Sequence, residues 1–186
     1  MNKEMKCIES TKGPCYCRLL CNHLFLTIFI FTIVFTSDQI TKIAIRHHMH
    51  RGESRPVLEN VTGPLIRITY VENPGIAFGI RVRNGTLFTV FSILASIGII
   101  VYLILHRHEG MGVKGGMALI LGGACGNLLD RILYKQVVDF VDVGLNNHFR
   151  WPVFNVADSA VVVGMVILFY TVMVSEKKKA LQQQSE

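Results

Sequence analysis

Residues 113–133, VKGGMALILGGACGNLLDRIL, decide the fold of this 186-residue chain. The run is mostly apolar and comparable in length to the ~20 residues with which an α-helix crosses a bilayer. Glycines recur along it, at positions 115, 116, 122, 123 and 126, and small residues allow membrane helices to approach one another closely. We therefore predict a membrane-spanning helix that lies at the centre of a helix bundle.

Three other apolar runs of similar length lie at residues 19–36, 86–105 and 155–174. The chain is short and 51% hydrophobic, which favours a small membrane protein over a soluble domain. We expect the first run to remain as an anchor, because Ser37 and Asp38 follow it without the small-residue pattern of a signal cleavage site. The predicted fold class is a mainly α membrane protein, built as a four-transmembrane-helix bundle.

The long connection between the first two runs has a pattern typical of β-structure. Residues 65–71 are rich in β-branched side chains, and an Asn-Pro-Gly turn at 73–75 separates them from a second such segment at 76–82. A further turn is predicted at the Asn-Gly pair, 84–85. We expect a small extracytoplasmic β-platform at about residues 55–85 that lies on the membrane.

An even number of spans places both termini on one side of the membrane. Basic residues are frequent in both tails, and cytoplasmic segments carry an excess of Lys and Arg. We therefore expect a cytoplasmic N-terminal tail at residues 1–18, a four-span domain at 19–174 and a cytoplasmic C-terminal tail at 175–186. Residues 134–152 are interpreted as a second outer loop that follows the membrane surface, with Trp151 as an interfacial anchor.

The formal net charge of +6 is attributed to Lys and Arg side chains that flank the spans. The sequence contains no basic stripe interleaved with aromatic residues, so we expect no nucleic-acid partner. The histidine and cysteine spacings lack the HExxH and Cys-x-x-Cys patterns of common metal sites, so we expect no metal and no cofactor. The cysteines near the N-terminus are expected to be reduced thiols. They are Cys7, Cys15, Cys17 and Cys21.

Four aspartates fall at the predicted outer ends of the spans or in the adjoining loop. A charged side chain at the centre of a membrane helix costs about 2.5 to 3.5 kcal/mol on insertion scales, so each of these acids needs a reason. Because all four are expected at one face of the membrane, a single extracytoplasmic site could contain them. They are Asp38, Asp130, Asp139 and Asp158.

Three of these acids also have a purely structural explanation. Asp158 follows Asn155 by three residues at the start of the last span, which is the spacing of a helix N-cap with an acid in the first turn. Asp130 could form an ion pair with the arginine that follows it. Asp38 and Lys42 have the i, i+4 spacing of a pair on one helix face.

Two carboxyl groups that share one water molecule cannot both ionise cheaply, so one is a base and the other an acid. Such a pair hydrolyses a peptide bond without a metal or a covalent intermediate. A serine nucleophile is disfavoured, because no serine has a Lys or His at the same predicted membrane depth.

Two other function classes remain open. A small proton-coupled channel or transporter also uses intramembrane acids, but it predicts acids spread across the membrane depth. A purely structural scaffold predicts that Asp139→Asn and Asp158→Asn leave function unchanged.

Five blocks of sequence make the chain similar to the lipoprotein signal peptidase (signal peptidase II) family, over about residues 37–174. Each block alone is weak evidence, but all five occur in the family's order and at matching positions relative to the spans. The blocks are Ser37–Lys42, Asn73–Gly79, Gly122–Arg131, Val137–Phe140 and Phe154–Ser159.

The resemblance implies that Asp139 and Asp158 are the catalytic aspartates. Asp158 would be the more readily ionised of the two, because it lies near a helix N-terminus, and Asp139 would carry the proton. The resemblance also implies residues that bind substrate or shape the rim of the site, with Asp130 in support. They are Asn73, Asn127, Arg131, Asn155, Asp38 and Lys42, the last two at the rim.

The same resemblance implies a substrate and a location. The substrate would be a prolipoprotein with a diacylglyceryl-modified cysteine, cut on the N-terminal side of that cysteine. The enzyme would be a monomer in the bacterial inner membrane, with both termini cytoplasmic, its active site at the extracytoplasmic face and membrane lipid around it.

Overall fold

The computed structural model describes residues 14–57, 59–63, 65–77, 80–81, 86–146 and 149–183. The turn predicted at 84–85 lies outside these ranges, as do Cys7 and the side chains of the other three cysteines near the N-terminus.

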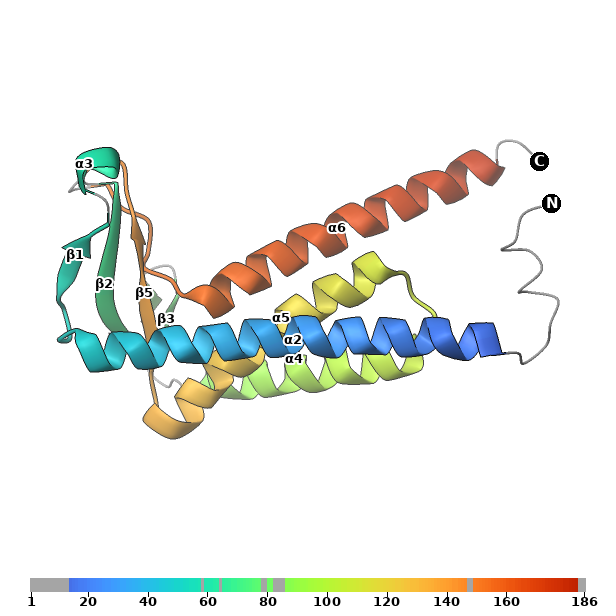
Figure 1. The fold of residues 1–186 in the computed structure, drawn as a ribbon, viewed down its shortest axis with the longest axis horizontal. Helices are drawn as coiled ribbons and strands as arrows, with labels where there is room; N and C mark the ends of the chain where they lie inside the picture. The colour runs from blue at the N-terminus through green and yellow to red at the C-terminus, as the bar shows by residue number, and fades with distance from the viewer. Residues whose placement is uncertain are drawn as a thin grey trace.

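Within the described residues, four long helices confirm the predicted bundle. They are α2 (Pro14–His48), α4 (Thr86–Leu105), α5 (Met111–Tyr134) and α6 (Val156–Gln183). All four are long and apolar enough to cross a membrane. The chain enters α2 and leaves α6 at the same end of the bundle, opposite the β-sheet (Figure 1).

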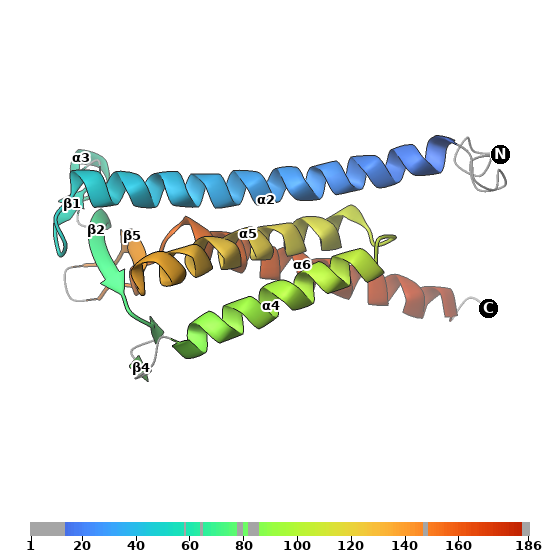
Figure 2. The same cartoon turned by 90° about the horizontal axis from the view of Figure 1, so that it is seen from below.

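Helix α5 lies at the centre, as its glycines predict. It packs against α2, α4 and α6, and Figure 2 shows α2 and α4 on either side of it. A Cβ atom on Gly122 would lie 2.9 Å from Val34 Cβ of α2, and one on Gly116 would lie 3.0 Å from the Gly164 carbonyl oxygen of α6. Such contacts leave no room for a side chain, so the glycines let both neighbours reach the α5 backbone.

Helix α2 continues twelve residues beyond the apolar run that predicted it, from Thr36 to His48. The added segment contains Asp38 and Lys42, which interrupt the hydropathy pattern. Both side chains are fully buried inside the protein and paired with each other, so neither meets lipid. The helix can therefore extend through this polar segment to the sheet.

A three-stranded antiparallel sheet caps one end of the bundle, in the order β1-β2-β5. The strands are β1 (Ser54–Pro56), β2 (Ile66–Asn73) and β5 (Val137–Val143). Strand β2 confirms the strand expected at 65–71. The interpretation of residues 134–152 as an outer loop was wrong for residues 137–143, because these form β5 and pair with β2.

The described residues beyond the bundle also include two smaller features. A short helix, α3 (Glu59–Thr62), joins β1 to β2. Strands β3 (Ile76–Ala77) and β4 (Ile80–Arg81) form a separate two-stranded antiparallel pair after β2.

Phe154 joins β5 to the start of α6. Its backbone N–H donates to the Val141 carbonyl at 3.1 Å, and its carbonyl accepts from the N–H groups of Phe140 and Val141 at 3.0 and 2.7 Å. Behind this joint, Tyr70, Val138 and Phe140 pack in one buried cluster. The first turn of α6 is therefore held beside the middle of β5.

Candidate functional site

Asp139 projects from β5 at the level where β2 ends. Its strand position lies opposite Val71, and its side chain is 4% exposed. The Asn73 side-chain amide donates to Oδ2 at 3.1 Å, and the Asn155 amide donates to Oδ1 at 2.7 Å. Both carboxyl oxygens are thus held by amides from two different elements.

The Asn73 amide is oriented by the turn that follows it. The backbone N–H of Gly75 donates to Asn73 Oδ1 at 3.0 Å, which leaves Nδ2 to point at Asp139. Gly75 has φ 120°, a value that side-chain-bearing residues rarely adopt. The Asn-Pro-Gly turn predicted from the sequence therefore places a hydrogen-bond donor on the carboxyl group.

Asp158 lies in the first turn of α6 and forms a reciprocal cap with Asn155. The Asp158 N–H donates to Asn155 Oδ1 at 2.9 Å, and the Asn155 N–H donates to Asp158 Oδ2 at 3.2 Å. This confirms the capping explanation. The other carboxylate oxygen, Oδ1, accepts from Asn127 Nδ2 at 2.8 Å, so the cap also holds the acid in one position.

Asn127 on α5 connects the two aspartates to a buried lysine. Its Oδ1 accepts from Lys42 Nζ at 2.8 Å and from Asn155 Nδ2 at 3.1 Å. Because an amide has one oxygen and one NH₂ group, those two donors force Nδ2 toward Asp158. The lysine thereby sets the orientation of an amide that contacts an aspartate.

A buried ionic cluster lies behind these amides. Lys42 pairs with Asp38 at 2.8 Å and with Asp130 at 3.2 Å, and Arg46 pairs with Asp130 at 2.9 Å. The two carboxylates also accept backbone N–H bonds, Asp38 from the start of α6 at 3.0 Å and Asp130 from β5 at 3.2 Å. The cluster thus ties α2 and α5 to the two segments that carry Asp139 and Asp158.

This placement corrects two expectations. Asp38 and Lys42 form the predicted i, i+4 pair, but they are fully buried and do not lie at the rim of a cavity. They sit behind Asn127, because the face of α2 that carries them turns toward α5. Asp130 takes Lys42 and Arg46 as its partners, whereas the sequence had suggested the neighbouring Arg131.

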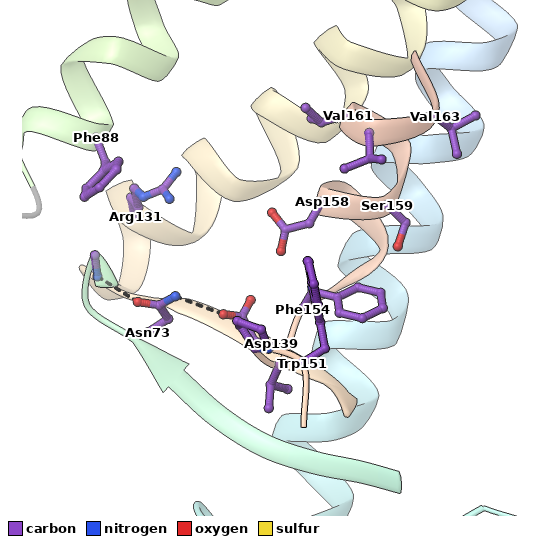
Figure 3. A pocket seen from close by; sticks show the side chains of 14 residues that line it. Asn73, Phe88, Arg131, Asp139, Trp151, Phe154, Asp158, Ser159, Val161 and Val163 are labelled. Carbon is purple, nitrogen blue, oxygen red and sulfur yellow. Dashed lines mark hydrogen bonds between the residues drawn. The ribbon is translucent and has the colours of Figure 1, made fainter. Parts of the chain in front are cut away.

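Asp139 and Asp158 both line a cavity of about 620 Å³ (Figure 3). Asn73 and Arg131 lie at its polar side, and Val162 of α6 belongs to its apolar wall. The cavity is therefore bordered by polar groups near the sheet and by apolar side chains along the bundle. The remaining lining residues are Gly75, Phe88, Trp151, Pro152, Val153, Phe154, Ser159, Val161 and Val163.

Arg131 faces this cavity from α5. Its Nη1 donates to Ser92 Oγ of α4 at 3.4 Å, and its guanidinium carbon lies 5.8 Å from the centre of the Phe88 ring. The contacts to α4 hold a positive charge on the side of the cavity opposite α6 in Figure 3.

Burial and the nearby Asp158 carboxylate together raise the pKa of Asp139 to about 7. Hydrogen bonds from Asn73 and Asn155 favour the charged form and offset part of that increase. Near neutral pH the Asp139 carboxyl group is therefore protonated in a large share of molecules. The arrangement supplies a proton donor next to a second carboxyl group, which is the composition of an acid–base pair.

Two contributors to the site were not predicted from the sequence. Arg46 pairs with Asp130. It follows Lys42 by four residues, so the helical spacing could have placed it on the same face of α2 as Asp38 and Lys42. Phe154 acts through its backbone, for which the sequence offers no signal. Among the described residues, no group of three or more His, Cys, Asp or Glu side chains could hold a metal ion.

Comparisons with known proteins agree on one family. The family described as signal peptidase (SPase) II matches residues 30–174. A lipoprotein signal peptidase of Syntrophus aciditrophicus (strain SB) is 36% identical over an alignment of 162 residues that covers 83% of this chain and 98% of that protein. Another, of Halothermothrix orenii (strain H 168), is 39% identical over 145 residues, which are 78% of this chain and 93% of that protein.

Solved structures give the same result for the fold. A bacterial membrane enzyme superposes with a TM-score of 0.73 at 30% identity, over 82% of this chain and 90% of the other. A second bacterial membrane enzyme has a TM-score of 0.69, also at 30% identity.

Proposed function

Because this chain belongs to the signal peptidase II family, we propose that it hydrolyses its substrates as an aspartic peptidase, with Asp139 and Asp158 as the catalytic pair. As a member of that family it is an integral membrane peptidase that removes signal peptides from prolipoproteins. The alternative of a channel or transporter has no support in the comparisons.

One observation carries the proposal: two carboxyl groups face one cavity, and the pKa of one of them, Asp139, is raised to about 7. A general acid works best when its pKa is close to the pH at which the enzyme operates. Asp158, capped in the first turn of α6, sits where the helix dipole favours negative charge. The environments of the two groups therefore assign them different roles.

The reaction follows from those roles. The Asp158 carboxylate takes a proton from a water molecule as the water oxygen attacks the scissile carbonyl carbon. Protonated Asp139 donates its proton to the carbonyl oxygen, which gives a neutral tetrahedral diol. As the diol collapses, the C–N bond breaks, the amine nitrogen takes the proton from Asp158, and Asp139 recovers a proton from a diol hydroxyl.

Asn73 and Arg131 are further polar residues along the cavity, and they are placed to bind the peptide backbone of the substrate. Arg131 offers donors to peptide carbonyl groups from the α4 side. Asn127 and Asn155 do not line the cavity. They act as positioning residues that hold the two carboxyl groups, which differs from the substrate contacts implied by the resemblance.

The substrate of this reaction is a diacylglyceryl-modified prolipoprotein, cut on the N-terminal side of the lipidated cysteine. The apolar wall of the cavity supports this proposal, because Val162 and Val163 of α6 are about half exposed on the bundle surface, where acyl chains can approach from the bilayer. The site then faces the extracytoplasmic side of a bacterial inner membrane, and both tails are cytoplasmic.

The test uses purified full-length protein in detergent and a synthetic lipidated precursor. Asp139→Asn and Asp158→Asn should each lower the cleavage rate by at least about 10³-fold, because each removes one half of the acid–base pair. Asp142→Asn is a matched control in the same strand: its side chain pairs with Arg150 and does not line the cavity. The control should keep most of the activity.

Retained cleavage in both aspartate variants would overturn the aspartic mechanism. It would favour the scaffold alternative for this pair, and the peptidase chemistry would then have to come from other residues of the chain.

A further inference from the structure

A second cavity lies at the end of the bundle opposite the sheet. It has a volume of about 380 Å³ and runs between α2 and α4. Leu24 of α2 and Ile100, Leu103 and Ile104 of α4 form its walls. Helix α5, which lies between α2 and α4 in Figure 2, contributes Lys114 to this groove.

Two basic residues mark one end of the groove. Arg107 is exposed just beyond the end of α4, whereas Lys114 on α5 is only 7% exposed. The Lys114 ammonium donates to the Arg107 backbone carbonyl at 2.6 Å, which fixes the two residues next to each other. Lys114 lies in the first turn of α5, so both charges are close to this end of the bundle.

We propose that this groove binds an anionic phospholipid, with the phosphate at Arg107 and Lys114 and an acyl chain along Leu103 and Ile104. The bilayer around the four spans supplies such a molecule directly. A phosphodiester beside two cations and a chain beside apolar side chains match the two halves of the groove in charge and polarity. A soluble anion would leave the apolar half unused.

The charge of the headgroup is the feature that this groove selects. Phosphatidylglycerol carries one net negative charge, whereas phosphatidylcholine carries a compensating positive group beside its phosphate. Basic side chains next to a membrane helix favour anionic lipids over zwitterionic ones. The groove is also separate from the cavity of Asp139 and Asp158, since no residue lines both.

Native mass spectrometry of the full-length protein in detergent tests the proposal. Palmitoyl-oleoyl phosphatidylglycerol and phosphatidylcholine differ in headgroup and share the same chains, so they isolate the effect of charge. The dissociation constant of the first bound lipid should be at least about fivefold lower for phosphatidylglycerol than for phosphatidylcholine. Arg107→Gln should abolish that preference, and Leu103→Trp, which fills the groove, should weaken the binding of both lipids.

Lys178→Gln is the matched control. Lys178 is an exposed lysine near the end of α6, so its loss removes the same charge at the same end of the bundle without touching the groove. The preference should persist in this variant. An equal effect of Arg107→Gln and Lys178→Gln would overturn the proposal, because the selectivity would then come from general surface charge.

Two further results would also overturn it. Displacement of the lipid by millimolar glycerol phosphate alone would make the site one for a soluble anion. A lipid-free dimer that Leu103→Trp dissociates would make the groove a contact between two copies of the chain.

Discussion

Raising the pH from 6 to 9 should lower kcat/KM about 90-fold by removing the proton from Asp139. With a pKa of about 7, the protonated fraction of that carboxyl group falls from about 90% at pH 6 to about 1% at pH 9. If the protonated form is the acid that protonates the scissile carbonyl, kcat/KM falls about tenfold for each pH unit above 7. The alkaline limb reflects Asp139, because burial and the Asp158 carboxylate raise its pKa.

The assay measures initial rates on the synthetic lipidated precursor between pH 5 and 9.5. The pH profile of kcat/KM reports the ionisation of groups in the free enzyme. The Asp142→Asn variant should show the same alkaline limb as the wild type. A rate that stays constant from pH 6 to 9 would refute this assignment of the proton donor.

The raised pKa of Asp139 also predicts the direction in which the free energy of unfolding changes with pH. The folded protein holds the Asp139 proton up to about pH 7, whereas the unfolded chain releases it near the ordinary aspartate pKa of 3.8. This contribution to stability is complete below pH 3.8 and is lost as the pH rises to 7. It amounts to a few kcal/mol at most, because a tenfold difference in proton affinity between the two states corresponds to roughly 1.4 kcal/mol. Thermal unfolding in detergent should show the loss in the wild type and not in Asp139→Asn.

Three other substitutions, one of them with a matched control, test the residues that support the site. Lys42→Met should destabilise the protein by about 3 to 5 kcal/mol in thermal unfolding, because two buried carboxylates lose their common partner. Gly126→Ala should cost about 1 to 3 kcal/mol, because the new Cβ would lie 2.5 Å from Asp38 Oδ2, whereas Gly98→Ala, with nothing within 4 Å, should not lower the melting temperature. Gly75→Ala should lower the cleavage rate at least tenfold with a smaller effect on melting, because strain at φ 120° moves the asparagine amide that holds a catalytic carboxyl group.

The membrane spans could be predicted from the sequence because the bilayer imposes a length and an apolar composition on each of them. Helix α4, Thr86–Leu105, has the predicted ends, since its composition changes sharply at both. The end of α2 could not be predicted in this way. In its last part, Asp38 and Lys42 are polar in sequence and buried in the structure, and hydropathy does not distinguish a polar residue inside the bundle from one in water.

In the sheet and the site, too, local features could be predicted from the sequence and long-range contacts could not. Strand β2 has a local β-pattern, and the turn at Asn73 follows from its residue types. Strand β5 has a similar pattern, Val-Val-Asp-Phe-Val-Asp-Val, but its pairing with β2 connects residues more than sixty positions apart. The spacing of Asp38 and Lys42 predicts that they meet, but it does not reveal which side of the helix turns inward.

The backbone hydrogen bonds of Phe154 affect how the site responds to bilayers of different thickness. A spanning helix adapts to a thicker or thinner bilayer mainly by changing its tilt. Helix α6 begins one residue after Asn155, and Phe154 is bonded to β5 on both its N–H and its carbonyl. A change in the tilt of α6 therefore carries the strand along with it, and Asp139 and Asp158 keep their mutual spacing as the lipid composition varies.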